Sequence, residues 1–137
     1  MKVFYEPYAY PLERAHPEDA GADIRSPQDY RLLPFSSVII PTGVHVELPE
    51  GTCGQLVSKS GLNVNHGITS TGLIDQGFTG EIVVKLYNQS PDTYDVKAGD
   101  KVSQLVVMPC RYEPFEVVDH LEEKAGRGSN GFGSTGR

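Results

Sequence analysis

Tryptophan is absent from the sequence, and cysteine occurs only twice among its 137 residues. Cys53 and Cys110 stand alone, with no C-x-x-C spacing, and the four histidines form no H-x-x-x-H pair. Because zinc sites and disulfide frameworks depend on such spacings, neither is indicated. We interpret the two cysteines as buried free thiols.

Long apolar runs are also missing. No run approaches the roughly 18 residues that a membrane-spanning helix needs. The first residues, MKVFYEPYAYPLE, contain acidic residues and two prolines where a signal peptide needs a continuous apolar stretch. We therefore expect a cytoplasmic protein with no membrane partner.

Positive charge is scarce, since 12 lysines and arginines stand against 18 acidic residues and the formal net charge is -6. Nucleic acids and anionic membranes are bound chiefly by clustered lysine and arginine. We therefore expect no nucleic-acid partner, and any phosphate group must be bound locally by a few residues.

Stretches that could form a helix are few, because 15 glycines and 10 prolines are spread through the chain. In VHVEL, residues 44–48, apolar and polar residues alternate with the period of a strand that has one solvent-facing side. Further β-branched runs are SSVIIP, GEIVVKLYN, KVSQLVVMP and FEVVDHL. The turn signals PTG, LPEG, QSPD and KAGD separate the runs at a spacing typical of a sandwich or barrel. We predict an all-β, jelly-roll-like body.

The chain length fits one domain, and the clear change of composition comes after Leu121. There the acidic EEK leads into a glycine-rich tail with no aliphatic residue larger than alanine. We divide the chain into a body over residues 1–124 and an arm over residues 125–137. The arm cannot bury enough apolar surface to order itself, so we expect it to be flexible unless a ligand orders it.

Two stretches combine a charged residue with small ones. AGADIRS, residues 20–26, places Asp23 just after a small, flexible turn, where an acid most often satisfies its own backbone. SKSGLN, residues 58–63, puts a lysine and two hydroxyls before a glycine. This second stretch predicts either a small anion-binding nest or a polar turn in which Ser60 caps a short helical turn.

Two later stretches carry polar side chains among apolar ones. GLIDQGFTGEI, residues 72–82, ends an apparently buried stretch with Asp75. A carboxylate there is costly to desolvate unless it is hydrogen-bonded or has a task such as positioning a water, although an aspartate that opens the β-turn DQGF is the default. GDKVSQLVV, residues 99–107, puts Gln104 among apolar neighbours, where its amide needs backbone or ligand partners.

Taken in order, these stretches resemble the five motifs of the trimeric dUTPase family, the dUTP nucleotidohydrolases. AGADIRS resembles the first motif, SKSGL the second, GLIDQGFTGEI the third, GDKVSQLVV the fourth and RGSNGFGSTG the fifth. The order, the spacing and the chain length all fit, and the resemblance covers essentially the whole chain.

The resemblance implies an intertwined homotrimer of jelly-roll subunits, a distorted barrel of the β-clip type, with three active sites at subunit interfaces. It implies hydrolysis of dUTP to dUMP and pyrophosphate with Mg²⁺, which keeps uracil out of DNA and supplies dUMP for dTMP synthesis. By match, Asp75 holds the attacking water, and Asp23 helps to place the metal through its water shell. The substrate-binding residues implied for the body are Lys59, Ser60, Gly61, Gly72, Phe78 and Gln104.

The tail is similar to the arm that folds over bound nucleotide in this family. Phe132 can stack on a flat base, and Arg127 can form charge-assisted bonds to the terminal phosphate. Small arm residues let backbone N–H groups and hydroxyls approach that phosphate; they are Gly131, Gly133, Ser134 and Thr135. Closure of the arm would exclude water other than the nucleophile.

Several features depart from the usual family pattern. Lys59 stands where arginine is common, Phe78 where tyrosine is usual, and Thr79 where arginine is frequent. The segment HGITST before Gly72 is shorter than we expect for the hairpin that reads uracil, which we place within residues 65–71.

Two alternatives remain open. The related dCTP deaminases, including bifunctional deaminase/dUTPases, share the fold and a similar ID-x-G-F/W segment, but their catalytic glutamate would align near Lys85, which cannot act as that base. The second alternative is a non-catalytic nucleotide-binding trimer on the same fold. Asp23, Asp75, Gln104 and the arm argue against it, because a sensor needs no water-activating acid.

Overall fold

The computed structural model describes residues 1–122. The arm predicted over residues 125–137, with Arg127, Gly131, Phe132, Gly133, Ser134 and Thr135, lies outside the described residues. The elements of the described part are β1 (Lys2–Tyr5), β2 (Gly21–Arg25), β3 (Tyr30–Leu32), β4 (Ser37–Glu47), β5 (Thr52–Val57), α1 (Ser60–His66), β6 (Ile68–Ile74), β7 (Glu81–Asn88), β8 (Tyr94–Val96) and β9 (Lys101–Pro109).

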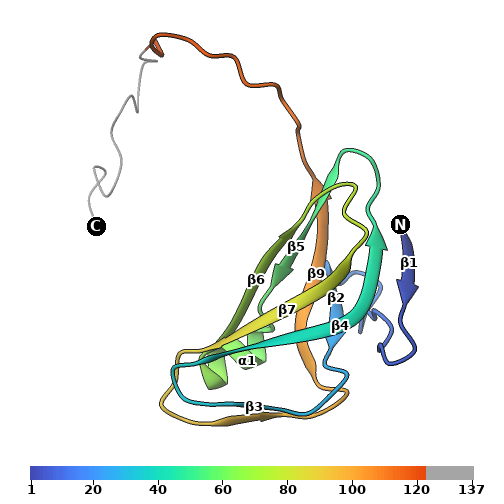
Figure 1. Cartoon of the computed structure of the whole chain (residues 1–137), viewed down its shortest axis with the longest axis vertical. Helices are drawn as coiled ribbons and strands as arrows, with labels where there is room; N and C mark the ends of the chain where they lie inside the picture. The colour runs from blue at the N-terminus through green and yellow to red at the C-terminus, as the bar shows by residue number, and fades with distance from the viewer. Residues whose placement is uncertain (123–137) are drawn as a thin grey trace.

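Seven strands form one large sheet in the order β1-β4-β7-β6-β5-β9-β2, and β3 pairs with β8 in a small second sheet. The pairings are antiparallel. The large sheet curls into an open half-barrel, and β3 and α1 lie at one end of it (Figure 1). The predicted all-β class is confirmed, and the curled sheet fits the expected jelly-roll-like body.

The described residues contain one short helix, α1, which ends at His66 and is followed by Gly67 with a left-handed φ of 64°. Lys59 is the residue before the helix and makes no side-chain cap, while Ser60 is already the first helical residue. The interpretation of Ser60 as a helix cap is therefore wrong. No helix within residues 1–122 is long and apolar enough to cross a membrane. The cytoplasmic location stays a prediction.

The PTG stretch does not turn the chain. β4 runs straight through it, and its register with β7 shifts between Pro41 and His45. Gly43 lies in this shift with a φ of 69°, and its N–H donates to Glu81 Oε1 at 2.7 Å. A bulge of this kind absorbs extra residues without ending the pairing. The predicted turn at PTG is therefore wrong, whereas the turns at LPEG and KAGD are confirmed.

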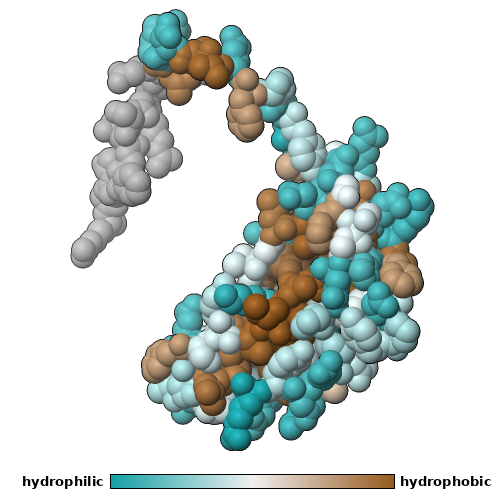
Figure 2. All heavy atoms as spheres, viewed as in Figure 1, coloured by the Kyte–Doolittle hydropathy of each residue, from teal (hydrophilic) through white to brown (hydrophobic). Residues whose placement is uncertain are grey.

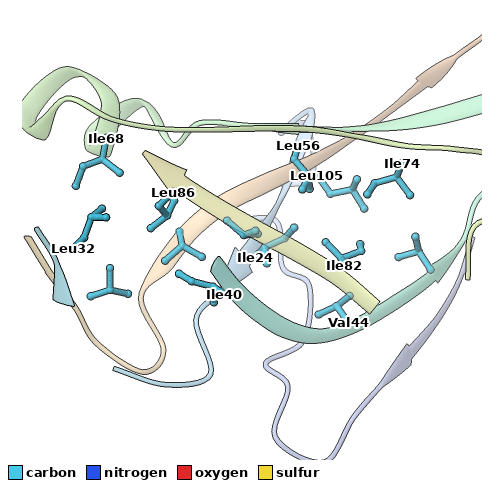
Figure 3. Packing of buried hydrophobic residues seen from close by; sticks show 14 of the residues in the cluster. Ile24, Leu32, Ile40, Val44, Leu56, Ile68, Ile74, Ile82, Leu86 and Leu105 are labelled. Atoms are coloured by element: carbon cyan, nitrogen blue, oxygen red, sulfur yellow. The ribbon is translucent and has the colours of Figure 1, made fainter. Parts of the chain in front are cut away.

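Branched apolar side chains fill the inside of the curled sheet (Figure 3). In β7, Ile82, Val84 and Leu86 are buried, whereas Val83 and Tyr87, at alternate positions of the strand, are exposed. Burial of one such aliphatic side chain contributes about 1.5–3 kcal/mol. The alternation therefore stabilises the sheet through the core on its inner face and leaves side chains of the outer face accessible.

The segment FEVVDHL, residues 115–121, forms no strand in the single chain. The chain leaves the body after β9 (Figure 1), and apolar side chains lie along this projecting segment (Figure 2). Phe115 is 100% exposed, Val117 98% and Leu121 85%. The predicted strand fails here because strand backbone groups need a neighbour, and within residues 1–122 this segment has none.

The two cysteines differ in their surroundings. Cys53 is buried on β5, whereas Cys110 follows β9 and is partly exposed. Burial and the adjacent Cys110 thiol raise the pKa of the Cys53 thiol. The prediction of two buried free thiols is therefore confirmed for Cys53 and wrong for Cys110.

Candidate functional site

Asp23 is the buried acid of this fold, with 4% of its surface exposed. It lies within β2 and pairs with Gln104 of β9. Its backbone N–H donates to the carbonyl of Glu13 at 2.7 Å. The default interpretation of Asp23 as a turn residue is therefore wrong, because the strand directs its carboxylate beside Gln104.

Two lysines hold the Asp23 carboxylate. The Lys59 ammonium donates to Oδ1, and the Lys101 ammonium donates to Oδ2 at 2.7 Å. Burial alone would raise the pKa of Asp23, but hydrogen bonds and charge from Lys101 and Lys59 outweigh it and lower that pKa. One carboxylate between two ammonium groups leaves this cluster with a net positive charge, which suits a phosphate ligand.

Gln104 joins this cluster to the end of β5. Its Nε2 donates to the carbonyl of Ser58 at 3.1 Å, so backbone satisfies part of the amide. The Ser58 hydroxyl in turn donates to the carbonyl of Ser70 at 3.1 Å. A Cβ atom on Gly21 would lie 2.5 Å from Gln104 Oε1, so a side chain there would displace the amide from this position.

Lys59, Ser60 and Gly61 follow β5 directly and lead into α1. Ser60 and Gly61 are exposed, and a Cβ on Gly61 would meet open space. The structure therefore brings Lys59, Asp23 and Gln104 together as the sequence predicts, with open room beside Ser60 and Gly61.

Asp75 lies elsewhere, directly after β6. Its carbonyl accepts the N–H of Phe78 at 3.1 Å, and Gly77 has a φ of 86°, so DQGF is the β-turn that the sequence suggests. Gln76 Oε1 accepts the N–H of Gly51 at 2.7 Å and ties this turn to the β4–β5 turn. Asp75 is exposed in the single chain, so the expected burial of its carboxylate is wrong for one chain alone.

Phe78 and Gly72 flank the Asp75 turn. The Phe78 side chain is 44% exposed, and its ring lies 2.6 Å from where a Cβ of Gly80 would be, so glycine leaves room for the ring. Gly72 lies on β6 against Leu56 of β5.

The segment predicted to read uracil, residues 65–71, does not reverse direction within its own length. Residues 65–71 comprise the end of α1, Gly67 and the first part of β6, which is one continuous strand. β6 pairs with β7 over Ile68–Ser70 and with β5 over Thr71–Ile74. The chain reverses after β6, over residues 75–80, so β6 is one arm of an antiparallel pair with β7. The assignment of residues 65–71 to uracil recognition stays a prediction.

The strand register separates Asp75 from the lysine cluster. Asp23 pairs with Gln104, Gln104 with Val57 and Val57 with Thr71, which spans three strand spacings. Asp75 lies four residues beyond Thr71 along the chain. With about 4.8 Å per strand and about 3.3 Å per residue, Asp75 and Asp23 are roughly 20 Å apart along the sheet. One chain therefore carries two half-sites rather than one complete site.

The acidic residues do not build a metal cage. Among residues 1–122, no three His, Cys, Asp or Glu side chains are grouped so that they could hold a metal ion. Both carboxylate oxygens of Asp23 already accept an ammonium group. Mg²⁺ that accompanies nucleotides is held mostly by phosphate oxygens and water, with one or two carboxylates. Asp23 therefore fits a magnesium ion that it touches only through water.

Lys101 also belongs to this cluster, although the sequence pattern does not predict it. Lys101 lies three residues before Gln104 in GDKVSQLVV. A basic residue in the same stretch as Gln104 is the feature of the sequence that could have indicated it. Lys85, the position of the deaminase glutamate, instead lies on β7 with its ammonium 5.0 Å from the centroid of the Tyr87 ring.

The curled sheet with a polar cluster on its outer face is the architecture of an all-β, jelly-roll class of nucleotide hydrolases. A family model described as dUTPase matches residues 8–136. The chain belongs to the dUTPase family, and with it to the dUTP diphosphatases.

Two curated relatives named deoxyuridine 5'-triphosphate nucleotidohydrolase illustrate the similarity. The protein of Gloeothece citriformis is 40% identical over 124 residues, covering 88% of this chain and 85% of the relative. That of Leifsonia xyli subsp. xyli is 42% identical over 126 residues, covering 89% and 82%.

Solved structures of phage dUTPases share the fold. The Staphylococcus bacteriophage 80alpha dUTPase with dUpNHpp superposes with a TM-score of 0.92 at 29% identity, covering 99% of this chain and 98% of that one. A D95N mutant dUTPase from phage phi11 of S. aureus, described with a structural Mg(II) ion, superposes with a TM-score of 0.80 at 28% identity, covering 87% and 96%.

Proposed function

We propose that this chain hydrolyses dUTP to dUMP and pyrophosphate as a homotrimer whose active sites are shared between subunits. Family membership and the dUTP analogue in the phage 80alpha relative support the substrate. Such an activity keeps uracil out of DNA and supplies dUMP for dTMP synthesis. The separation of Asp75 from the lysine cluster carries the proposal of shared sites.

A base must lie within hydrogen-bond reach of its water, about 3 Å, and that water must reach phosphorus. Phosphates held by Lys59 are therefore out of reach of Asp75 on the same chain, roughly 20 Å away along the sheet. A second copy supplies Asp75 to the cluster of the first. This arrangement also gives Asp75, exposed in one chain, the enclosed setting that the sequence predicts.

The projecting segment supports assembly. Its apolar side chains are exposed in the single chain, with Phe115 at 100% and Val117 at 98%. Exposed apolar residues of this extent mark interaction surfaces. A neighbouring subunit would cover these side chains. The projecting segment would then lead the chain to that subunit's site, where the arm of residues 125–137 closes over the nucleotide.

In the reaction, the Asp75 carboxylate orients a water and accepts its proton as the water attacks phosphorus. The Lys59 ammonium binds the phosphates together with the Ser60 hydroxyl and the backbone N–H groups of Ser60 and Gly61. Gln104 orients the phosphates. Phe78 packs against the deoxyribose, and Gly72 lets the ligand approach β6 closely. These groups contribute positioning and charge neutralisation, which dominate phosphoryl transfer.

Mg²⁺ would arrive with the triphosphate, and Asp23 would touch it through water. When bound, the ion neutralises charge that develops on the phosphates. The structural Mg(II) ion described for the phi11 relative supports a magnesium requirement. The role of Asp23 in the protein itself is to keep the two lysines in place around the phosphate site.

Arm residues complete the proposed site. Phe132 stacks on uracil and Arg127 bonds to the terminal phosphate, while Gly131, Gly133, Ser134 and Thr135 let the backbone approach it. Closure removes bulk water and strengthens the remaining electrostatic interactions.

The test is pyrophosphate release from dUTP with Mg²⁺, measured beside ammonia release from dCTP. The proposal requires pyrophosphate from dUTP and no ammonia. Ammonia from dCTP would instead support the deaminase alternative. Because Lys85 stands where the deaminase glutamate would align, another residue would then have to act as the base. Tight nucleotide binding without either product would support a non-catalytic trimer.

A further inference from the structure

We propose that Lys101 is a second phosphate-binding lysine of this site, and that Asp23 is the positioning residue that holds Lys101 and Lys59 at either side of the phosphate. The inference rests on the proposed function for the identity of the nucleotide. It concerns a residue that lies at the start of β9, next to the β2–β9 bulge.

The geometry places both lysines on one carboxylate. Lys101 Nζ lies 2.7 Å from Asp23 Oδ2, and Lys59 Nζ donates to Oδ1. Their side chains are 34% and 26% exposed, whereas that of Asp23 is 5% exposed. The acid is thus buried, while the two lysine side chains are partly exposed.

Each ammonium group has three donors and no acceptor. Asp23 takes one donor from each lysine, which leaves two donors on each ammonium group for a ligand or solvent. An anion placed there would meet two positive charges held at a fixed separation, without the entropy cost of ordering two long side chains. This is the setting that binds a phosphate chain strongly.

A purely structural role would look different. For comparison, Lys97 pairs with Asp29 at 3.0 Å, but both side chains are mostly exposed, at 65% and 61%. Exposed pairs of that kind contribute little. Two lysines on one buried acid, beside Gln104, form a built site and not a surface ion pair.

The experiment measures binding of the non-hydrolysable α,β-imido-dUTP and of dUMP by calorimetry, for wild type, Lys101→Met, Lys101→Arg and the control Lys97→Met. We expect Lys101→Met to weaken analogue binding about tenfold, with a smaller effect on dUMP, because a hydrogen bond to a charged group is lost. Lys101→Arg restores most of the affinity, and Lys97→Met changes nothing. In turnover assays, we expect the factor by which Lys101→Met raises KM to be about ten times the factor by which it lowers kcat.

Removal of Lys101 also leaves Asp23 with one partner, so its own charge could repel the phosphate. The comparison of Asp23→Asn with Asp23→Asn/Lys101→Met separates the two effects. If Lys101 binds phosphate, the double variant binds the analogue more weakly than Asp23→Asn, though by less than the roughly tenfold expected when Asp23 holds Lys101 in place. Equal affinities of these two proteins would overturn the inference.

Failure of the proposed function is recognised separately. Wild type that binds the analogue but releases no pyrophosphate from dUTP would contradict hydrolysis and leave the Lys101 measurements interpretable. Wild type that hydrolyses dUTP while Lys101→Met binds the analogue as wild type does would contradict only the role of Lys101.

Discussion

The Asp23 side chain is buried, and its carboxylate accepts both the Lys59 and the Lys101 ammonium groups. Its carboxylate stabilises the fold only while it is charged. The lysines therefore make this acid both a binding element and a contributor to stability.

The lowered pKa of Asp23 predicts a pH dependence of the free energy of unfolding. A lowered folded-state pKa gives stability that is complete above the unfolded value of about 3.9 and is lost as pH falls through the folded value. Asp23→Asn lacks this contribution. We expect the stability gap between wild type and Asp23→Asn, measured by urea unfolding, to be larger at neutral pH than in strong acid.

Asp95→Asn is the control for this experiment. Asp95 pairs with Arg31 at 3.5 Å, and both side chains are largely exposed. Such a pair contributes little, so its removal should leave the stability nearly unchanged at both pH values. A gap for Asp23→Asn that does not narrow in acid would contradict the ion-pair account.

Asp75→Asn tests the proposed base. The amide keeps the size of the side chain but cannot accept the proton of the water, and general base catalysis is typically worth about 10²–10⁴-fold. We expect kcat to fall by about this factor while α,β-imido-dUTP still binds. Near wild-type turnover in a steady-state pyrophosphate assay would show that another group is the base.

The sequence could identify individual residues of the site because their neighbours are unusual, as with Asp23 after Ala-Gly and Asp75 before a Gln-Gly turn. It could not identify Lys101, whose partner Asp23 lies on another strand and far away in the sequence. It also misjudged the burial of Asp75, since burial there depends on what covers the turn in three dimensions. Long-range pairing is the information that a local pattern lacks.

The Asp75 turn depends on Gly77, whose φ of 86° favours glycine. A Cβ on Gly77 would meet no atom within 4 Å, so the cost of Gly77→Ala is backbone strain alone. We expect Gly77→Ala to lower the free energy of unfolding by about 1 kcal/mol, measured by urea denaturation. Distortion of the turn should also lower kcat.

Gly61→Ala is the matched substitution. Gly61 also has no atom within 4 Å of a built Cβ, but it lies inside α1 and has no positive φ. Alanine favours helix there, so we expect a gain of about 0.5–1 kcal/mol. A loss in both variants would contradict the distinction between turn strain and helix preference.

Among the elements, strands with a clear apolar alternation were predictable, as β7 and β9 show. The PTG stretch predicts a turn because proline and glycine usually mark one, but in the structure its pairing with β7 makes it a bulge within β4. FEVVDHL has strand composition without a strand, because composition does not supply a partner. Both predictions fail because strand structure also depends on the neighbouring strand, which the sequence of the segment itself does not reveal.

For the whole molecule, a chain that ends at Lys124 tests the arm. It keeps the projecting apolar segment that we propose for assembly and lacks only residues 125–137. We expect a trimer by light scattering with most of the dUTP hydrolysis lost, because closure over the nucleotide is no longer possible. Undiminished hydrolysis by this truncated chain would remove the arm from the mechanism.

The central claim is that one active site takes its lysine cluster and its Asp75 from different copies. Lys59→Met and Asp75→Asn, each nearly inactive alone, are unfolded together in equal amounts and refolded. Random assembly should then leave about a quarter of the sites with both halves intact, so hydrolysis of dUTP should recover to about that fraction of wild type. The same mixture of Asp75→Asn with Asp75→Ala should recover nothing. No recovery in the first mixture, despite confirmed mixed trimers, would contradict the shared site.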